Sequence, residues 1–308
     1  MDSERRPAPR RPAGPAAWAA LFTVWVVWGS TYLAIRVADR TISPFPMAAV
    51  RYLTAGLLLY PVALAAARRD RGGNSPAPAR GSLRQWAGMA VVGTMLLAFG
   101  NGGVSYAERT LPSGLAALLV ASVPLWMALA DRVINGQRLA PRGWAALVIG
   151  LTGIAVLAQP HGHEAVLPVL VVLGASMSWG IGSVLAGRLP SPASPLVGSA
   201  MEMLAGGTVL VALAAATGEA PPAHPSAESL LAVAYLIGPG SLLALTCYVI
   251  ALRRLPAAVV STYAYVNPVV AVALGALILG ERLTPTTFIG GAIVVASIAL
   301  LLSQRAKD

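Results

Sequence analysis

The sequence is poor in the residues from which most enzyme sites are built. Charged residues make up 11% of its 308 residues, whereas about a quarter of a soluble domain is charged. Its single cysteine, Cys247, lies in an apolar stretch, which excludes an intrachain disulfide. Of three histidines, His161 and His163 share a short loop with no third ligand nearby, so we predict no metal site. HExxH, phosphate-loop and GxSxG motifs are also missing, which argues against an enzyme, a cofactor and direct use of ATP.

Apolar residues dominate what is present. They account for 56% of the chain, and the mean hydropathy is +0.71. A helix needs about 20 apolar residues to cross a bilayer, so we searched windows of that length. The sequence predicts an all-α integral membrane protein with ten transmembrane helices, at about 16–35, 45–66, 83–102, 112–131, 141–158, 166–186, 194–216, 228–249, 256–278 and 284–303.

The chain carries a formal net charge of +10, and its basic residues are unevenly distributed. A nucleic-acid partner is not expected, because these residues are scattered among loops instead of lying on one face. With the N-terminus inside, 17 of the 22 Lys and Arg residues fall in cytoplasmic segments and four in the opposite loops. The positive-inside rule therefore predicts a multi-pass plasma-membrane protein with cytoplasmic tails at 1–15 and 304–308. A secretory signal is the alternative for the N-terminus, but its apolar run is too long for one.

Segments of the first half of the chain recur in the second half, first at an offset of 151 residues and then of 144. The matching pairs are WG (28–29) with WG (179–180), AAVRYLTAG (48–56) with SAMEMLAGG (199–207), LPSGLAALLVASVP (111–124) with LPAAVVSTYAYVNP (255–268), and GQRLAP (136–141) with GERLTP (280–285). We therefore predict two related halves, 16–158 and 166–303, joined by a linker at 159–165. Five helices is an odd number, so the second half enters the membrane from the other side. Such inverted repeats have a central substrate site near mid-membrane.

One charged residue lies inside an apolar helix of each half. Arg51 corresponds to Glu202, so the charge keeps its position and changes sign. A charge near the middle of a membrane helix costs ~2.5 to 3.5 kcal/mol on insertion scales, so a matched pair indicates function. We expect Arg51 to hold a substrate carboxylate and Glu202 to exchange protons, with a direct ion pair between them left open. The alternative is structural, with Arg51 extending to the headgroups and Glu202 bonding hydroxyls or backbone.

Pro124 and Pro268 lie at equivalent positions in the middle of the fourth and ninth helices. Proline lacks an amide hydrogen, so each is expected to interrupt its helix and to leave one carbonyl without its usual partner. Such backbone is tolerated only where it is buried in protein or lines a wet cavity. Paired interruptions favour a transport site, and a purely structural kink is the alternative.

Glycine and glutamate mark the expected ends of helices. The glycines around Asn101 predict that the third helix ends near residue 102, with a gating hinge as the alternative. Glu108 and Glu281, each followed by arginine, are expected to be caps and anchors at the membrane interface.

Aromatic, hydroxyl and amide side chains gather on the first, sixth, eighth and ninth helices. We expect them to line the cavity and to contact substrate by stacking and hydrogen bonding, although packing is the commoner role of any single one. They are Trp28, Thr31, Tyr32, Trp179, Tyr248, Tyr263 and Asn267.

Four sets of residues carry a family resemblance. They are WGSTYLAIR in the first helix, the PxxxAxxRY pattern formed by Pro44, Ala48, Arg51 and Tyr52, ASVPL in the fourth helix, and YVNPVVAVALGALILGERLTP at 265–285. Over about 16–303, these residues resemble the EamA-type transporters of the drug/metabolite transporter superfamily, as two tandem EamA repeats. The resemblance implies ten helices around a central cavity and transport down a gradient or coupled to protons. Because the family includes exporters of amino acids, other metabolites and toxic compounds, it does not identify the substrate.

We therefore predict a secondary transporter that exports small organic metabolites, namely amino acids or related zwitterions, by alternating access. Its expected partners are the lipid bilayer, a small-molecule substrate and, if transport is coupled, protons; a homodimer is left open. The first alternative is an exporter of drugs or toxic compounds, which the Trp and Tyr residues would suit. An integral-membrane enzyme or a receptor is the alternative of another class.

Overall fold

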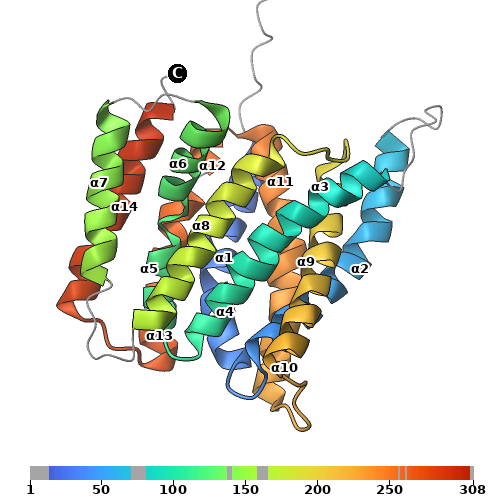
Figure 1. The fold of residues 1–308 in the computed structure, drawn as a ribbon, viewed down its shortest axis with the longest axis horizontal. Coiled ribbons are helices and arrows are strands. Elements are labelled where there is room, and N and C mark those ends of the chain that lie inside the picture. The colour runs from blue at the N-terminus through green and yellow to red at the C-terminus, as the bar shows by residue number, and fades with distance from the viewer. Residues whose placement is uncertain are drawn as a thin grey trace, which may run out of the picture.

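The computed structural model describes residues 14–70, 81–136, 141–157, 166–255, 257–260 and 262–305, and within these ranges every regular element is a helix (Figure 1). Seven helical segments are long and apolar enough to cross a membrane: Pro15–Ala38, Pro44–Arg69, Leu83–Glu108, Ser113–Asn135, Val166–Ala186, Pro195–Thr217 and Ala227–Leu252. Three shorter apolar helices complete the bundle: Pro141–Leu157, Tyr263–Leu279 and Pro285–Leu300. The predicted all-helical membrane fold is confirmed at this level.

In chain order the elements are α1 (Pro15–Ala38), α2 (Pro44–Asp70), α3 (Leu83–Gly93), η1 (Thr94–Asn101), α4 (Gly102–Glu108), α5 (Ser113–Val120), α6 (Val123–Asn135), α7 (Pro141–Leu157), α8 (Val166–Ala186), α9 (Pro195–Thr217), α10 (Ala227–Tyr235), η3 (Leu236–Leu243), α11 (Ala244–Arg254), α12 (Ala257–Val260), α13 (Tyr263–Leu279) and α14 (Pro285–Arg305). The segments η1 and η3 are π-helical. Several helices begin at proline, which suits the first turn because its amide would lack a partner there.

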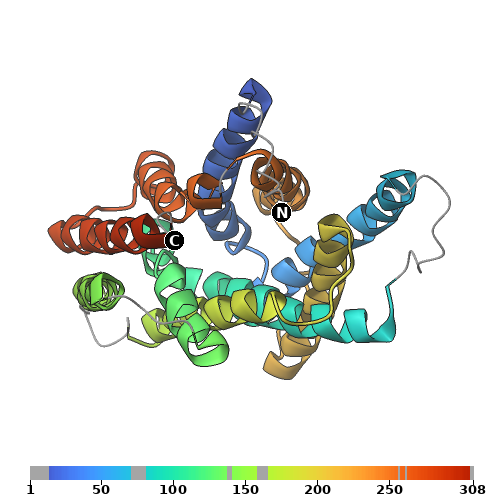
Figure 2. The ribbon, with the colours of Figure 1, turned by 90° about the horizontal axis from the view of Figure 1, so that it is seen from above.

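Helices α2 and α9 lie side by side and pack through two glycines (Figures 1 and 2). A Cβ at Gly56 would lie 2.9 Å from Leu204 Cγ, and a Cβ at Gly207 would lie 2.8 Å from Leu53 Cγ. At the offset of 151, Leu53 corresponds to Leu204 and Gly56 to Gly207. Each contact is therefore a copy of the other with the helices exchanged. Because the earlier residue of one helix meets the later residue of the other, the two helices run antiparallel.

Helices α7 and α14 repeat this arrangement at another edge of the bundle (Figure 2). A Cβ at Gly150 would lie 2.8 Å from Ser297 Oγ, and a Cβ at Gly153 would lie 2.8 Å from Val294 Cγ2. At the offset of 144, Gly150 corresponds to Val294 and Gly153 to Ser297, so these contacts are also reciprocal. Small residues allow such close backbone approach, which is how membrane helices gain van der Waals contact in lipid.

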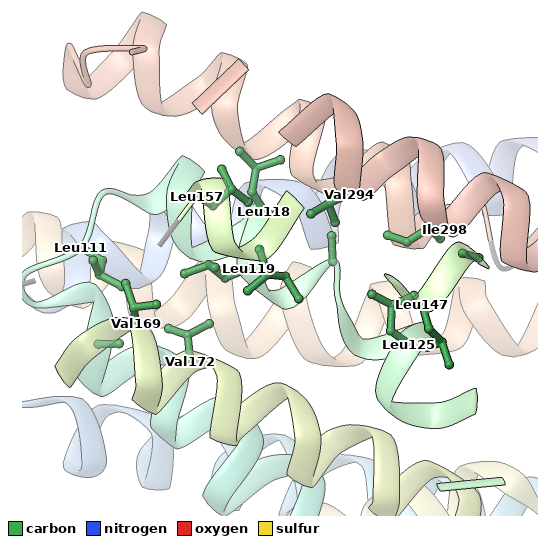
Figure 3. Close-up of a cluster of buried hydrophobic side chains, with 14 of the residues drawn as sticks. Leu111, Leu118, Leu119, Leu125, Leu147, Leu157, Val169, Val172, Val294 and Ile298 are labelled. Atoms are coloured by element: carbon green, nitrogen blue, oxygen red, sulfur yellow. The ribbon is translucent and has the colours of Figure 1, made fainter. Parts of the chain in front are cut away.

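A large apolar core joins several of the helices. Its large side chains come mainly from α5, α6, α7, α8 and α14, and Ala107 of α4 also belongs to it. Figure 3 shows large members of this core: Leu118, Leu119, Leu125, Leu147, Leu157, Val169, Val172, Val294 and Ile298. Other large apolar side chains point outward, such as Leu57 and Val62 of α2, each 65% exposed. An outward apolar surface of this kind suits a protein surrounded by lipid.

The third helix does not end at Asn101, and that prediction was wrong. The chain passes through η1 into α4 and stays helical as far as Glu108. The glycines serve close packing instead: a Cβ at Gly100 would lie 2.9 Å from Trp179 Cε3, and one at Gly102 would lie 2.7 Å from Leu210 Cδ2. A glycine-rich stretch is compatible with a helix end or with a tight helix contact, and here the neighbouring helices select the contact.

Two short interruptions divide the fourth and ninth predicted helices. Between α5 and α6, Ser122 Oγ donates to the Leu119 carbonyl (2.6 Å) and accepts from Trp126 Nε1 (3.1 Å). Between α12 and α13, Thr262 Oγ1 donates to the Val259 carbonyl (2.6 Å) and accepts from Trp25 Nε1 (3.2 Å). At both interruptions a hydroxyl thus bonds a backbone carbonyl, and an indole donates to that hydroxyl.

The two prolines lie differently relative to these interruptions. Pro124 is the second residue of α6, directly after the first interruption. Pro268 is buried inside α13, and the second interruption precedes it at Thr262. At the offset of 144, Ser122 of the first interruption corresponds to residue 266. The second interruption is at Thr262, four residues before that equivalent position, which is about one helical turn.

Candidate functional site

Arg51 is buried on α2 between the two π-helical segments, with 5% of its surface exposed. Its Nε donates to Ser241 Oγ of η3 (3.0 Å), and a terminal guanidinium nitrogen donates to Asn101 Oδ1 of η1 (3.3 Å). Ser241 Oγ in turn donates to the Leu236 carbonyl (2.9 Å), five residues back, as the wider π-helical turn allows. Within the described residues no carboxylate forms a salt bridge with Arg51. The guanidinium also lies over the Tyr52 ring, 4.8 Å from its centroid, so neutral groups hold this buried positive charge.

Three aromatic rings form a cluster next to η3. The Trp28 ring lies 5.2 Å from the Tyr248 ring and 5.2 Å from the Tyr263 ring, and the two tyrosine rings are 5.8 Å apart. Trp28 Nε1 donates to the Gly240 carbonyl of η3 (3.3 Å). The predicted residues Trp28, Tyr248 and Tyr263, from α1, α11 and α13, are thus brought together.

Gly240 is the point where this aromatic cluster meets Arg51. A Cβ at Gly240 would lie 3.2 Å from Thr31 Cγ2 and 3.8 Å from a terminal nitrogen of Arg51. Thr31 is itself buried, and its Oγ1 donates to the Trp28 carbonyl (2.6 Å). The guanidinium, a methyl group and an indole therefore surround one stretch of π-helical backbone.

Tyr32 and Asn267 lie close to this group in different ways. Tyr32 interacts electrostatically with Glu108, Tyr263 and Tyr52. The Asn267 amide, oriented so that its nitrogen is the donor, bonds the carbonyls of Trp25 (3.1 Å) and Tyr263 (3.2 Å). In this conformation Asn267 ties α1 to α13.

Glu202 and Trp179 lie apart from this group. Glu202 is half-buried on α9, where its backbone packs against Gly93 of α3. Trp179, on α8, packs beside Gly100 of η1. Across the described part of the chain, neither side chain has a hydrogen bond, ion pair or ring contact with Arg51 or the aromatic cluster. The ion pair between Arg51 and Glu202 that the sequence left open is not formed.

A charged pocket of about 450 Å³ lies where α1, α4 and α13 end. It is lined by Arg36, Asp39, Arg40, Arg109, Pro112, Leu279 and Glu281. The Glu281 carboxylate accepts from the amides of Ser113 (2.7 Å) and Gly114 (3.1 Å), the first two residues of α5. A carboxylate stabilises a helix N-terminus by satisfying free amides and by opposing the helix dipole. The predicted capping role of Glu281 is confirmed.

Glu108 does not behave as an interfacial cap, and that prediction was wrong. Its side chain is completely buried, and among the residues that the structure describes neither carboxyl oxygen has a hydrogen-bond partner. Glu108 is the last residue of α4, but this helix end is buried, and Arg36 of α1 donates to its backbone carbonyl.

Two stretches of the chain, 16–159 and 166–303, match the EamA-like transporter family. The chain belongs to this family. Over 288 residues it is 38% identical to the uncharacterized inner membrane transporter YedA of Escherichia coli K12, covering 92% of this chain and 90% of that protein. It is 28% identical over 291 residues to a probable terminal-alkyne amino-acid exporter of Streptantibioticus cattleyicolor, with 93% of each chain covered. It is 31% identical over 217 residues to the threonine/homoserine exporter RhtA of Escherichia coli K12, covering 67% of this chain and 70% of RhtA.

A solved crystal structure shares the fold, with a TM-score of 0.60, 22% sequence identity, and coverage of 95% of this chain and 99% of the other. Membership of the EamA family and the apolar helices identify a multi-pass membrane transporter. The family and the relatives' names point to transport and not to catalysis.

Sequence reasoning overlooked three polar residues of this EamA-family transporter: Ser241, the side chain of Asn101, and Glu108. Ser241 carries no motif, and its role depends on a partner 190 residues away. The signal that could have found Asn101 and Glu108 is the acidic residue that follows a glycine-rich apolar stretch, because a continuous helix keeps both residues within one apolar helical segment, Leu83–Glu108.

Proposed function

We propose that this EamA-family transporter exports amino acids or related zwitterions, and that Arg51 binds the carboxylate of the solute. The observation that carries the proposal is the buried guanidinium whose contacts in the described part of the chain are all neutral: the side chains of Ser241 and Asn101 and the Tyr52 ring. Arginine has five N–H donors in a planar fork that matches a carboxylate. Two of these donors engage neutral side chains, so the charge itself awaits a negative partner.

Alternating access would proceed between two inverted five-helix repeats, at 16–158 and 166–303, joined by 159–165 and making ten spans. The reciprocal contacts of α2 with α9 and of α7 with α14 support this topology. A two-fold axis that exchanges antiparallel helices is perpendicular to them, so for membrane-spanning helices it lies in the membrane plane. Inverted-topology repeats have that symmetry. The π-helical segments add support, since each has eight residues and they are 142 residues apart.

Arg51 is well placed to couple binding to movement. Asn101 belongs to the first proposed repeat and Ser241 to the second, so one guanidinium bonds both halves. A carboxylate that engages the guanidinium would compete with these two neutral acceptors and loosen the contact between the repeats. The interruptions near Pro124 and Pro268 supply further places where the helices can bend.

We assign proton exchange to Glu202. Glu202 is half-buried and has no hydrogen bond or ion pair among the described residues, so its carboxyl is free to change protonation state.

We also propose that both termini lie in the cytoplasm. The start of α1 and the end of α14 lie at the same end of the bundle (Figure 1). The excess of Lys and Arg in the segments at that end favours the cytoplasm.

The aromatic cluster favours a second candidate, export of apolar or cationic drugs. The cluster consists of Trp28, Tyr248 and Tyr263, whose ring centroids lie 5.2 to 5.8 Å from one another. A flat cation can stack on the face of such a ring. A drug exporter of this kind would not need the charge of Arg51.

Flux into proteoliposomes that contain only this protein tests the proposal. The probes are a panel of amino acids, the corresponding amino-acid amides and a lipophilic cationic dye. We expect amino acids to move and their amides, which lack a carboxylate, to move poorly. Arg51→Gln is expected to abolish amino-acid flux, and Arg132→Gln, which changes an exposed arginine on α6, serves as the matched control. Dye flux that persists in Arg51→Gln, without amino-acid flux in the wild type, would establish the second candidate instead.

A further inference from the structure

The buried carboxyl of Glu108 has no role in the function proposed above. Its side chain has 0% exposure, and both oxygens lack hydrogen-bond partners within the described ranges. Moving an ionised carboxylate out of water without hydrogen bonds costs far more than moving the neutral acid. The packing around Glu108 is therefore compatible with a protonated side chain in this conformation.

A second acidic residue, Asp39, lies at the same end of the bundle, where Arg36 lines a pocket with it and donates to the Glu108 carbonyl. Asp39 follows the last residue of α1 and lines the charged pocket, and neither of its carboxyl oxygens has a partner in the described part of the protein. Burial raises the pKa of Asp39 to about 8, although Arg109 and Arg36 lower it. Asp39 is among the residues that line the pocket, although its carboxyl oxygens are buried, whereas Glu108 is not among them.

The charged groups around the two acids come from several elements. Glu108 interacts electrostatically with Asp39, Arg36, Glu281 and Arg51, and also with Tyr32; Asp39 interacts with Arg109, Arg36 and Glu219. Arg36 has a special position, because its guanidinium donates to the backbone carbonyl of Glu108 and not to the carboxylate. Loss of a proton from Glu108 would create an anion that draws Arg36 away from that carbonyl. The proton state of Glu108 and the contact of α1 with α4 are thereby linked.

The other half of the chain shows that the fold does not require an acid here. At the offset of 144, Glu108 corresponds to Leu252, which is 41% exposed. The buried carboxyl is present in one half only, and no neighbouring group in the described part of the chain forms a hydrogen bond with it. Such a group indicates a function more than a role in packing.

We propose that Glu108 and Asp39 form a proton-binding pair that takes up protons from the side of the membrane opposite the termini. Water in the pocket delivers a proton to Asp39, and Asp39 passes it to Glu108, which holds it as the neutral acid. Release reverses the route: the Glu108 O–H bond breaks and the proton returns through Asp39 to water. This pair would exchange protons with the outer side of the membrane, and Glu202 would exchange them with the inner side. The inference therefore rests on the proposed transport function.

Infrared difference spectroscopy tests the pair without any substrate. The C=O stretch of a protonated carboxyl is recorded while the purified protein is titrated from acid to alkaline pH. We expect the wild type to retain this band at neutral pH, Glu108→Gln to lose the component that belongs to Glu108, and Asp39→Asn to remove a component that titrates near pH 8. Glu228→Gln, which removes an exposed acid paired with Arg40, is the matched control and should leave the band unchanged. If Glu108→Gln does not fold, Glu108→Leu takes its place, because the other half carries leucine at that position.

Flux measurements then connect the pair with transport. In proteoliposomes loaded with amino acids, lowering the pH on the pocket side should accelerate wild-type flux. We expect Glu108→Gln to lose at least ~10-fold of that acceleration, as removal of a positioned proton-transfer group commonly does. The proposal is overturned if the infrared band of Glu108→Gln is as strong as that of the wild type, or if the flux of the variant responds to pH as the wild type does. If the wild type moves no amino acid, the transport proposal fails, and the infrared titration still decides whether the pair binds protons.

Discussion

The two halves of this transporter are alike in their packing and unlike in their chemistry. Gly56 meets Leu204 as Gly207 meets Leu53, so the contact of α2 with α9 is the same from either side. At equivalent positions of the same two helices, Arg51 is buried and hydrogen-bonded, whereas Glu202 is half-buried without such a bond in the described ranges.

The difference indicates which properties duplication preserves. Close helix contacts depend on shape, and a symmetric contact retains its shape when both copies keep glycine and leucine. A site for an asymmetric solute gains nothing from symmetry, because a zwitterion has one carboxylate and one ammonium group. We infer that the halves share their glycines and leucines because assembly needs them, and that they differ at Arg51 and Glu202, to which we assign solute binding and proton exchange.

The largest expected effect contrasts Arg51 with Glu202. Removing one partner of a buried charge pair costs roughly 2 to 5 kcal/mol, so Arg51→Gln should weaken amino-acid binding roughly 100-fold. Glu202→Gln should lower flux driven by a pH gradient much more than it lowers binding affinity. Binding is measured by quenching of tryptophan fluorescence and flux in proteoliposomes. Equal losses of affinity in the two variants would contradict the separate roles of the two residues.

The symmetric contact itself can be broken from either half. Gly56→Ala and Gly207→Ala each force a methyl group into a leucine at 2.8 to 2.9 Å, and overpacking of this kind costs typically about 1 to 3 kcal/mol. We expect both variants to lower the thermal unfolding midpoint in detergent by similar amounts. Gly174→Ala on α8 is the control, because nothing lies within 4 Å of its Cβ position. A large loss for one glycine and none for the other would argue against the reciprocal contact.

The two neutral partners of Arg51 come from different halves and can be compared directly. Ser241 Oγ lies 3.0 Å from the guanidinium and Asn101 Oδ1 lies 3.3 Å from it. A hydrogen bond to a charged group contributes about 1.5 to 3 kcal/mol, so Ser241→Ala should change amino-acid affinity by roughly 10-fold and Asn101→Ala by less. Titration of each variant by tryptophan fluorescence provides the measurement. A larger effect for Asn101→Ala would place the stronger contact in the first half.

The smallest expected effect is the pH dependence that Asp39 contributes to stability. The pKa of Asp39 is raised from 3.8 to about 8 by burial, so between these values the folded protein holds a proton that the unfolded chain has released. Folding stability should therefore fall as pH rises from about 4 to about 8 and level off above that range. Asp39→Asn should flatten this dependence. The part of the pH dependence that is lost should amount to a few °C at most in the unfolding midpoint. A wild-type midpoint that rises across this range would refute the assignment.

Much of the architecture could be predicted from sequence because it depends on local composition. Long apolar runs predict membrane helices, and each predicted window overlaps one of the seven long or three shorter apolar helices, with the largest differences at the end of the third and the start of the ninth. The corresponding segments at offsets of 151 and 144 indicated two related halves, and the same positions make the reciprocal glycine contacts. The motifs also led to the EamA family, which is confirmed.

Other features depend on residues that are far apart in the chain. The path of the third helix at Asn101 was predicted wrongly, because its glycines suit a helix end as well as they suit contact with Trp179 and Leu210. That error hid the burial of Glu108.

By itself, the sequence determined that the chain forms apolar membrane helices, that its halves are related, and that Arg51 and Glu202 are unusual, since hydropathy and repetition are properties of local composition. Only the tertiary structure decided that Arg51 binds Ser241 and Asn101, from 190 and 50 residues away, and that Glu108 and Asp39 are buried without partners. The physical reason is that hydrogen bonding and desolvation depend on which groups surround a side chain in space, and helix packing brings those groups together.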